Sequence, residues 1–138
     1  MKRQANWYGL EMLPLYLEMS QGQLEASADQ LHNLEACKHR PHVLDDYTVD
    51  RVIKVFTEQN ESLWVFIEQC QKWRTQKPTK KQLASIEEVE NNTQQLEKSN
   101  NQILFLAHHF KNHTIDRILE KEDGELAVDF LSGKLYPP

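Results

Sequence analysis

Three histidines lie within six positions of the segment LAHHFKNHT, which covers residues 106–114: His108, His109 and His113. An imidazole can bind a metal ion, accept a phosphoryl group or exchange a proton near neutral pH. On a helix that advances about 100° per residue, His109 and His113 lie one turn apart on the same side, whereas His108 points elsewhere. The three side chains therefore belong to two different candidate sites.

The pair His109 and His113 is a candidate metal site, because imidazoles four residues apart on a helix can reach one ion. Phe110 stands where the zinc-hydrolase motif H-E-x-x-H has its glutamate, so that hydrolytic motif is absent. Further ligands would come from a facing helix, where His32 and Glu35 lie three residues apart. One alternative function is thus a bundle that holds a divalent metal ion through these four residues, and no other cofactor is predicted.

The run Leu106-Ala107-His108-His109-Phe110-Lys111-Asn112 resembles the signature of histidine phosphotransfer domains, which is apolar-Ala-His-x-apolar-Lys-Gly on a helical bundle. The resemblance implies that His108 is an exposed phospho-acceptor and that Lys111 is the cation beside the phosphoryl group. It covers residues 106–112 only, and Asn112 stands where the family has a small residue. This is the second alternative function.

Other catalytic motifs are missing from the sequence. It has no glycine-rich phosphate loop, no G-x-S-x-G turn and no C-x-x-C pair. Cys37 and Cys70 fall in separate segments, so we expect two free thiols. A non-enzymatic role is favoured over an enzymatic one.

The composition predicts one all-α domain over residues 1–138. The chain is 39% apolar and has only four glycines and five prolines. With 21 acidic and 16 basic residues, its net charge of −5 offers no general field for nucleic acid, which is an unlikely partner. The basic segment 71–81 is interpreted as the end of a helix. Charged residues and a proline interrupt residues 7–19, so we expect no membrane span and a cytoplasmic protein.

Apolar residues recur at helical spacing in three stretches. The first ends near Lys38, with a regular helix from about Leu13 and a separate turn over residues 7–12. The second is a single stripe over residues 49–74, after an N-cap at Asp45, Asp46 or Thr48. The third begins at Thr79, which forms a capping box with Gln82, and reaches residue 110.

Two polar residues, Thr93 and Asn100, fall on the apolar stripe of the third helix. A polar layer of this kind usually lowers stability and sets the register of packing. The helix either ends near residues 112–114 or continues to Lys121. A short amphipathic helix is expected in the tail, with Leu126, Phe130 and Leu131 on one side.

These elements predict a four-helix-type bundle of three long helices and one or two short C-terminal helices, which dimerisation could complete. The leading functional hypothesis is a protein-protein interaction module, a small regulatory or accessory subunit that binds a protein partner or forms a homo-oligomer. Its predicted interaction surface consists of Leu126, Phe130, Leu131, Trp7 and Tyr8.

Overall fold

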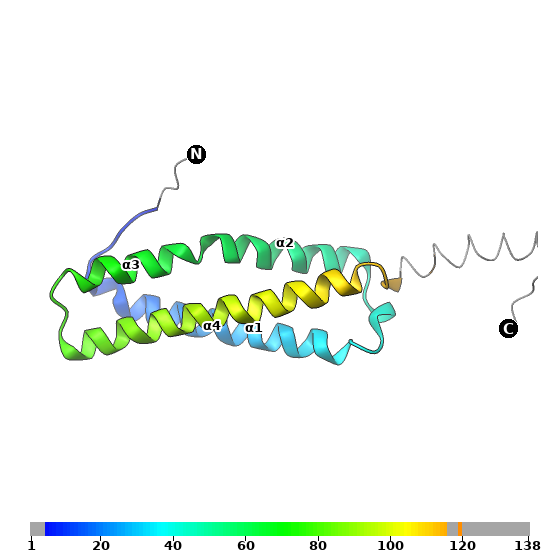
Figure 1. Ribbon diagram of the computed structural model, residues 1–138, viewed down its shortest axis with the longest axis horizontal. Helices are drawn as coiled ribbons and strands as arrows, with labels where there is room; N and C mark the ends of the chain where they lie inside the picture. Colours follow the sequence, from blue (N-terminus) through cyan, green and yellow to red (C-terminus); the bar gives the residue numbers. More distant parts are fainter. Residues whose placement is uncertain (1–4, 116–118, 120–138) are drawn as a thin grey trace, which may run out of the picture.

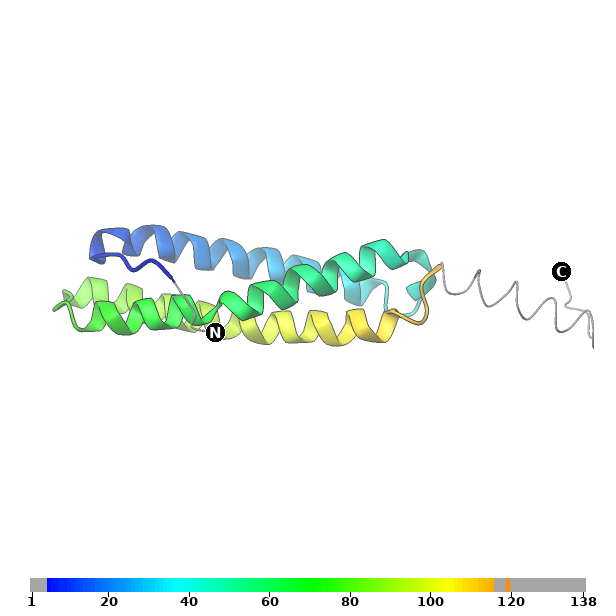
Figure 2. The same ribbon diagram turned by 90° about the horizontal axis from the view of Figure 1, so that it is seen from above.

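The computed structural model of the chain describes residues 5–115 and residue 119. Its helices are α1 (Leu13–Ala36), α2 (Asp46–Ser62), α3 (Trp64–Arg74) and α4 (Lys80–Phe110), with short 3-10 helices η1 (Leu10–Met12) and η2 (Pro41–Val43). They form an elongated bundle in which α1, the pair α2–α3 and α4 run side by side (Figures 1 and 2). No strand occurs among these residues, so the all-α prediction is confirmed. The predicted short C-terminal helix lies outside the described residues.

The first helix begins as predicted. Pro14 occupies the first turn of α1, where its missing N–H would have no helical acceptor, and η1 forms the separate turn before it. The helix ends when the N–H of Cys37 turns to the carbonyl of Leu34. Asp45 then caps α2 by accepting a hydrogen bond of 2.7 Å from the N–H of Thr48.

The prediction of one unbroken second helix was wrong, because the helix breaks at Leu63. In a regular helix the N–H of Leu63 would donate to the carbonyl of Gln59. The Ser62 hydroxyl donates to that carbonyl at 2.9 Å, and the Leu63 N–H turns to the carbonyl of Asn60 at 3.4 Å. A side chain that competes for a backbone acceptor is a known cause of helix breaks. The two halves, α2 and α3, still form one side of the bundle (Figure 1).

The third long helix, α4, contacts all the others. Its capping box is present, with Thr79 and Gln82 each bonding the other's backbone. It packs against α1 most extensively and also against α2 and α3. It ends at Phe110, followed by a turn in which the N–H of His113 donates to the Phe110 carbonyl. The alternative of one helix continuing to Lys121 was therefore wrong.

The core consists of two apolar clusters. The first contains Leu13, Tyr16, Leu63, Phe66, Cys70, Trp73, Ile86, Val89 and Leu96. The second contains Leu34, Val49, Val52, Ile103, Ala107 and Phe110. Between them along α4 lie buried Ser99 and Asn100, which hydrogen-bond to Ser27 of α1. Thr93 and Asn100 are both buried, as their places on the apolar stripe predicted.

Candidate functional site

The histidine-rich segment lies at the end of α4 that leads to the C-terminus. His108 and His109 belong to the last turn of the helix, and His113 belongs to the turn after it. All three side chains are exposed. The ring centroids of His109 and His113 are 5.7 Å apart, and the ring of Phe110 lies 5.8 Å from that of His109. The His109 and His113 rings are therefore neighbours, as expected, although α4 ends between the two residues.

The structure does not add the two further metal ligands to this pair. His32 and Glu35 are exposed near the C-terminal end of α1. Within the part of the chain that the structure describes, no three His, Cys, Asp or Glu side chains gather closely enough to hold one ion. A tetrahedral zinc ion takes four ligands, so two imidazoles would leave two positions to other groups. The metal alternative stays a prediction that rests on His109 and His113.

His108 has the accessibility that a phospho-acceptor needs, and Lys111 follows it directly after the helix. Its position is electrostatically unfavourable for that role. His108 lies two residues before the C-terminal end of α4, where the helix dipole is negative. A phosphoryl group adds up to two negative charges, which this dipole would repel. The phosphotransfer alternative likewise stays a prediction.

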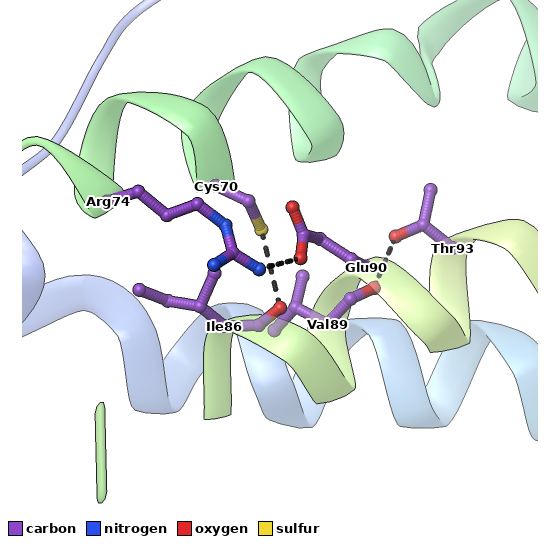
Figure 3. A network of polar contacts seen from close by, with 6 residues as sticks. All are labelled: Cys70, Arg74, Ile86, Val89, Glu90 and Thr93. Atoms are coloured by element: carbon purple, nitrogen blue, oxygen red, sulfur yellow. Dashed lines mark hydrogen bonds and ion pairs between the residues drawn. The ribbon is translucent and has the colours of Figure 1, made fainter. Parts of the chain in front are cut away.

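Two of the five cations in the basic segment 71–81 make contacts within the fold. The Lys72 ammonium lies 4.9 Å from the centre of the Trp7 ring, and Arg74 pairs with Glu90 of α4 (Figure 3). Trp73 is fully buried in the first cluster. These contacts support the interpretation of residues 71–81 as the cationic end of a helix.

Cys70 is a buried thiol between α3 and α4. Its sulfur atom lies 3.8 Å from the carbonyl oxygen of Ile86, to which the S–H donates (Figure 3). Burial, assisted by the negative charge of Glu90, raises the pKa of the thiol to about 12. Because the thiolate is the reactive form, Cys70 is not a nucleophile at neutral pH.

Of the predicted interaction residues, Trp7 and Tyr8 are exposed, at 37% and 41%. Trp7 packs edge-on against Trp64, with ring centroids 6.1 Å apart. The Tyr8 ring lies 6.2 Å from that of Tyr16 in α1, so the side chain of Trp7 contacts α3 and that of Tyr8 contacts α1. Leu126, Phe130 and Leu131 lie outside the described residues.

A groove between α1 and α4 was not predicted from the sequence. It has a volume of about 490 Å³, and it is lined by Leu31, Glu35, Lys38, Lys98, Asn101, Gln102, Phe105 and Leu106. Phe105 is 76% exposed. A helical projection of the sequence could have indicated that Phe105 is exposed, because Phe105 falls on the polar side of α4, opposite Ile103 and Ala107.

A second hollow, of about 450 Å³, lies at the break between α2 and α3. It is lined by Asn60, Glu61, Leu63, Trp64, Ile67, Thr93, Gln94 and Glu97. Its two charged residues are both acidic. Buried Thr93 turns its hydroxyl to the carbonyl of Val89, 2.7 Å away (Figure 3).

The helices that the structure describes include none with a stretch both long and apolar enough to cross a membrane. Comparisons of the chain with protein-family models, with curated proteins and with solved structures found no match.

Proposed function

We propose that this chain is a non-enzymatic protein-protein interaction module, a small regulatory or accessory subunit, that first of all binds a second copy of itself. The observation that carries the proposal is Phe105, whose ring is 76% exposed beside the groove between α1 and α4. Solvent-exposed aromatic rings that adjoin a groove are typical anchors of protein interfaces. We call Leu31, Glu35, Lys38, Lys98, Phe105 and Leu106 the Phe105 surface.

The shape of the Phe105 surface suits a twofold dimer. A twofold interface uses the same patch on both subunits, so the patch must offer both a projection and a recess. Phe105 is the projection, and the groove above Leu31 and Leu106, which are both partly buried, is the recess. Burial of an exposed phenylalanine side chain contributes about 1.5–3 kcal/mol to the free energy of association, and a twofold dimer buries two such side chains.

The charges of the Phe105 surface also suit its own copy. Glu35, Lys38 and Lys98 all line the groove. A patch with both signs can place its carboxylate against the lysines of an identical patch related by a twofold axis. Such rim pairs contribute up to about 1 kcal/mol each, and added salt weakens them.

The test is the oligomeric state of purified full-length chains, measured by sedimentation velocity and native mass spectrometry. We expect wild type to be a dimer and Phe105→Ser to be a monomer at the same concentration. Val55→Ser is the matched control, because Val55 is 44% exposed on α2 and lies outside the groove; it should remain a dimer. A wild type that stays monomeric at about 100 μM, or a dimeric Phe105→Ser, would refute the self-association.

A cytoplasmic location is part of the same proposal. Cys37 and Cys70 are free thiols in separate parts of the structure, one partly exposed and one buried. Unpaired cysteines are usual in reducing compartments.

A further inference from the structure

Residues 5–9, which we call the strap, precede η1 and lie against α3 (Figure 1). One residue of the strap carries the main-chain contacts. The N–H of Tyr8 donates to Oε1 of Gln69 at 2.8 Å, and Nε2 of Gln69 donates back to the Tyr8 carbonyl at 3.1 Å. The indole Nε1 of Trp73 donates to the same carbonyl at 3.0 Å. Both peptide groups of Tyr8 are thus held by two side chains of α3.

We infer that Gln69 and Trp73 form a binding site for one extended peptide residue, and that an extended segment of a partner protein can occupy it in place of the strap. A carboxamide offers one donor edge and one acceptor edge, which match the C=O and N–H of a main-chain residue. The contact resembles the pairing of one residue with a neighbouring strand, which is how many domains bind extended peptides.

Burial explains why a filled site is favoured. Gln69 and Trp73 are both 0% exposed with the strap in place. If the strap left and nothing replaced it, the amide and the indole N–H would exchange their peptide partners for water and lose the preformed geometry of the site. Release of the strap is therefore more favourable when another chain supplies the same peptide groups. Exchange of one segment for another is favoured over an empty site.

Exposure of the strap side chains shows what the site recognises. Trp7 and Tyr8 keep 37% and 41% of their surfaces in contact with solvent, whereas the N–H and the C=O of Tyr8 are both hydrogen-bonded to α3. The residue that pairs with Gln69 cannot be proline, because proline has no N–H to donate to Oε1 of Gln69. The residue before it is best aromatic, since Trp64 and the Lys72 ammonium both contact the Trp7 ring. A fitting partner segment is thus extended, and it has an aromatic residue followed directly by a residue other than proline.

The test measures peptide binding to full-length chains by fluorescence anisotropy. The probe is a labelled, end-capped peptide with the sequence of residues 5–9, Ala-Asn-Trp-Tyr-Gly. We expect saturable binding to wild type and binding about tenfold tighter, or more, to Tyr8→Pro, whose own strap can no longer donate to Gln69 and compete. Trp7→Ala weakens the strap without proline and should also bind more tightly than wild type, which keeps the test valid if Tyr8→Pro folds poorly by circular dichroism.

Two controls identify the site. A probe with proline in place of its tyrosine should not bind, and Gln69→Leu should lower the affinity of every chain for the intact probe. Phe105→Ser should bind like wild type, so this test can fail independently of the proposed dimer. No binding to any chain, or equal binding of the two probes, would overturn the inference. Cross-links between the strap of one wild-type copy and α3 of another would also overturn it, because the occupant would then be a second copy.

Discussion

Cys37 and Cys70 differ in the surroundings of their sulfur atoms. Cys37 is partly exposed at the end of α1, whereas Cys70 is buried and its pKa is raised to about 12. We expect iodoacetamide at about pH 8 to modify one thiol per folded chain and two per unfolded chain, counted by mass spectrometry. Cys37→Ser should leave the folded chain unmodified. Rapid modification of Cys70 in the folded chain would show that α3 separates from α4.

The raised pKa of Cys70 also makes stability depend on pH. The folded chain holds the thiol proton up to about pH 12, whereas the unfolded chain releases it near the ordinary value of 9.0. The unfolded state therefore binds fewer protons between these values, and the contribution of the thiol to stability is lost as pH rises from about 9 toward 12. The difference in free energy of unfolding between wild type and Cys70→Ala should shrink across this range in urea titrations. A constant difference would contradict the assigned pKa.

The burial of single residues was predictable where the signal lay in neighbouring residues. Thr93 and Asn100 were expected inside because they interrupt an apolar stripe, and both are buried. Gln69 also lies on a stripe, yet nothing near it in the sequence indicates its role. Its partner Tyr8 is 61 residues away, so the pairing appears only once the chain is folded.

At the scale of elements, Asn100 links all three sides of the bundle. Its Oδ1 accepts from the Ser27 hydroxyl of α1 at 2.7 Å, and its Nδ2 donates to Oε1 of Gln59 and Oδ1 of Asn60 at 2.7 and 3.0 Å. Both acceptors lie in the last turn of α2, directly before the break at Leu63. The polar layer therefore joins α1 and α4 to α2 where the second side of the bundle is interrupted.

Removal of the Asn100 side chain should be destabilising. Asn100→Ala leaves Ser27, Gln59 and Asn60 without their shared partner, and we expect a loss of about 2–3 kcal/mol in denaturant unfolding. Asn91→Ala is the control, because Asn91 is exposed on the same helix; it should change stability by less than about 0.5 kcal/mol. Equal effects of the two substitutions would show that the network contributes nothing beyond helix propensity.

The helix ends were more predictable than the break between α2 and α3. Caps such as Asp45 and Thr79 act on residues three positions away, so a short sequence contains the whole signal. The break combines the local bond of Ser62 with the contacts that Gln59 and Asn60 make to Asn100, about forty residues away. The apolar residues keep helical spacing through residues 49–74 despite the break. Because this spacing is continuous, it predicted one helix.

At the scale of the whole molecule, two apolar clusters share one continuous helix. Ile86, Val89 and Leu96 of α4 belong to the first cluster, whereas Ile103 and Phe110 belong to the second. The opposite side of the bundle is broken at Leu63, and α1 meets both clusters. Since α4 runs through both without a break, neither cluster can separate from the other without bending or unwinding that helix.

This arrangement predicts a single unfolding transition, which the tryptophans can test. Trp64 and Trp73 lie in α3, and Trp7 packs against Trp64, so tryptophan fluorescence reports on the end of the bundle with the first cluster. Far-UV circular dichroism reports on every helix. We expect the two signals to give the same urea midpoint, because two-state unfolding makes all probes coincide. Phe56→Trp adds a tryptophan against the second cluster. The fluorescence change that this variant shows in excess of wild type should follow the same curve. Separate midpoints would mean that the polar layer divides the bundle into two units that unfold independently.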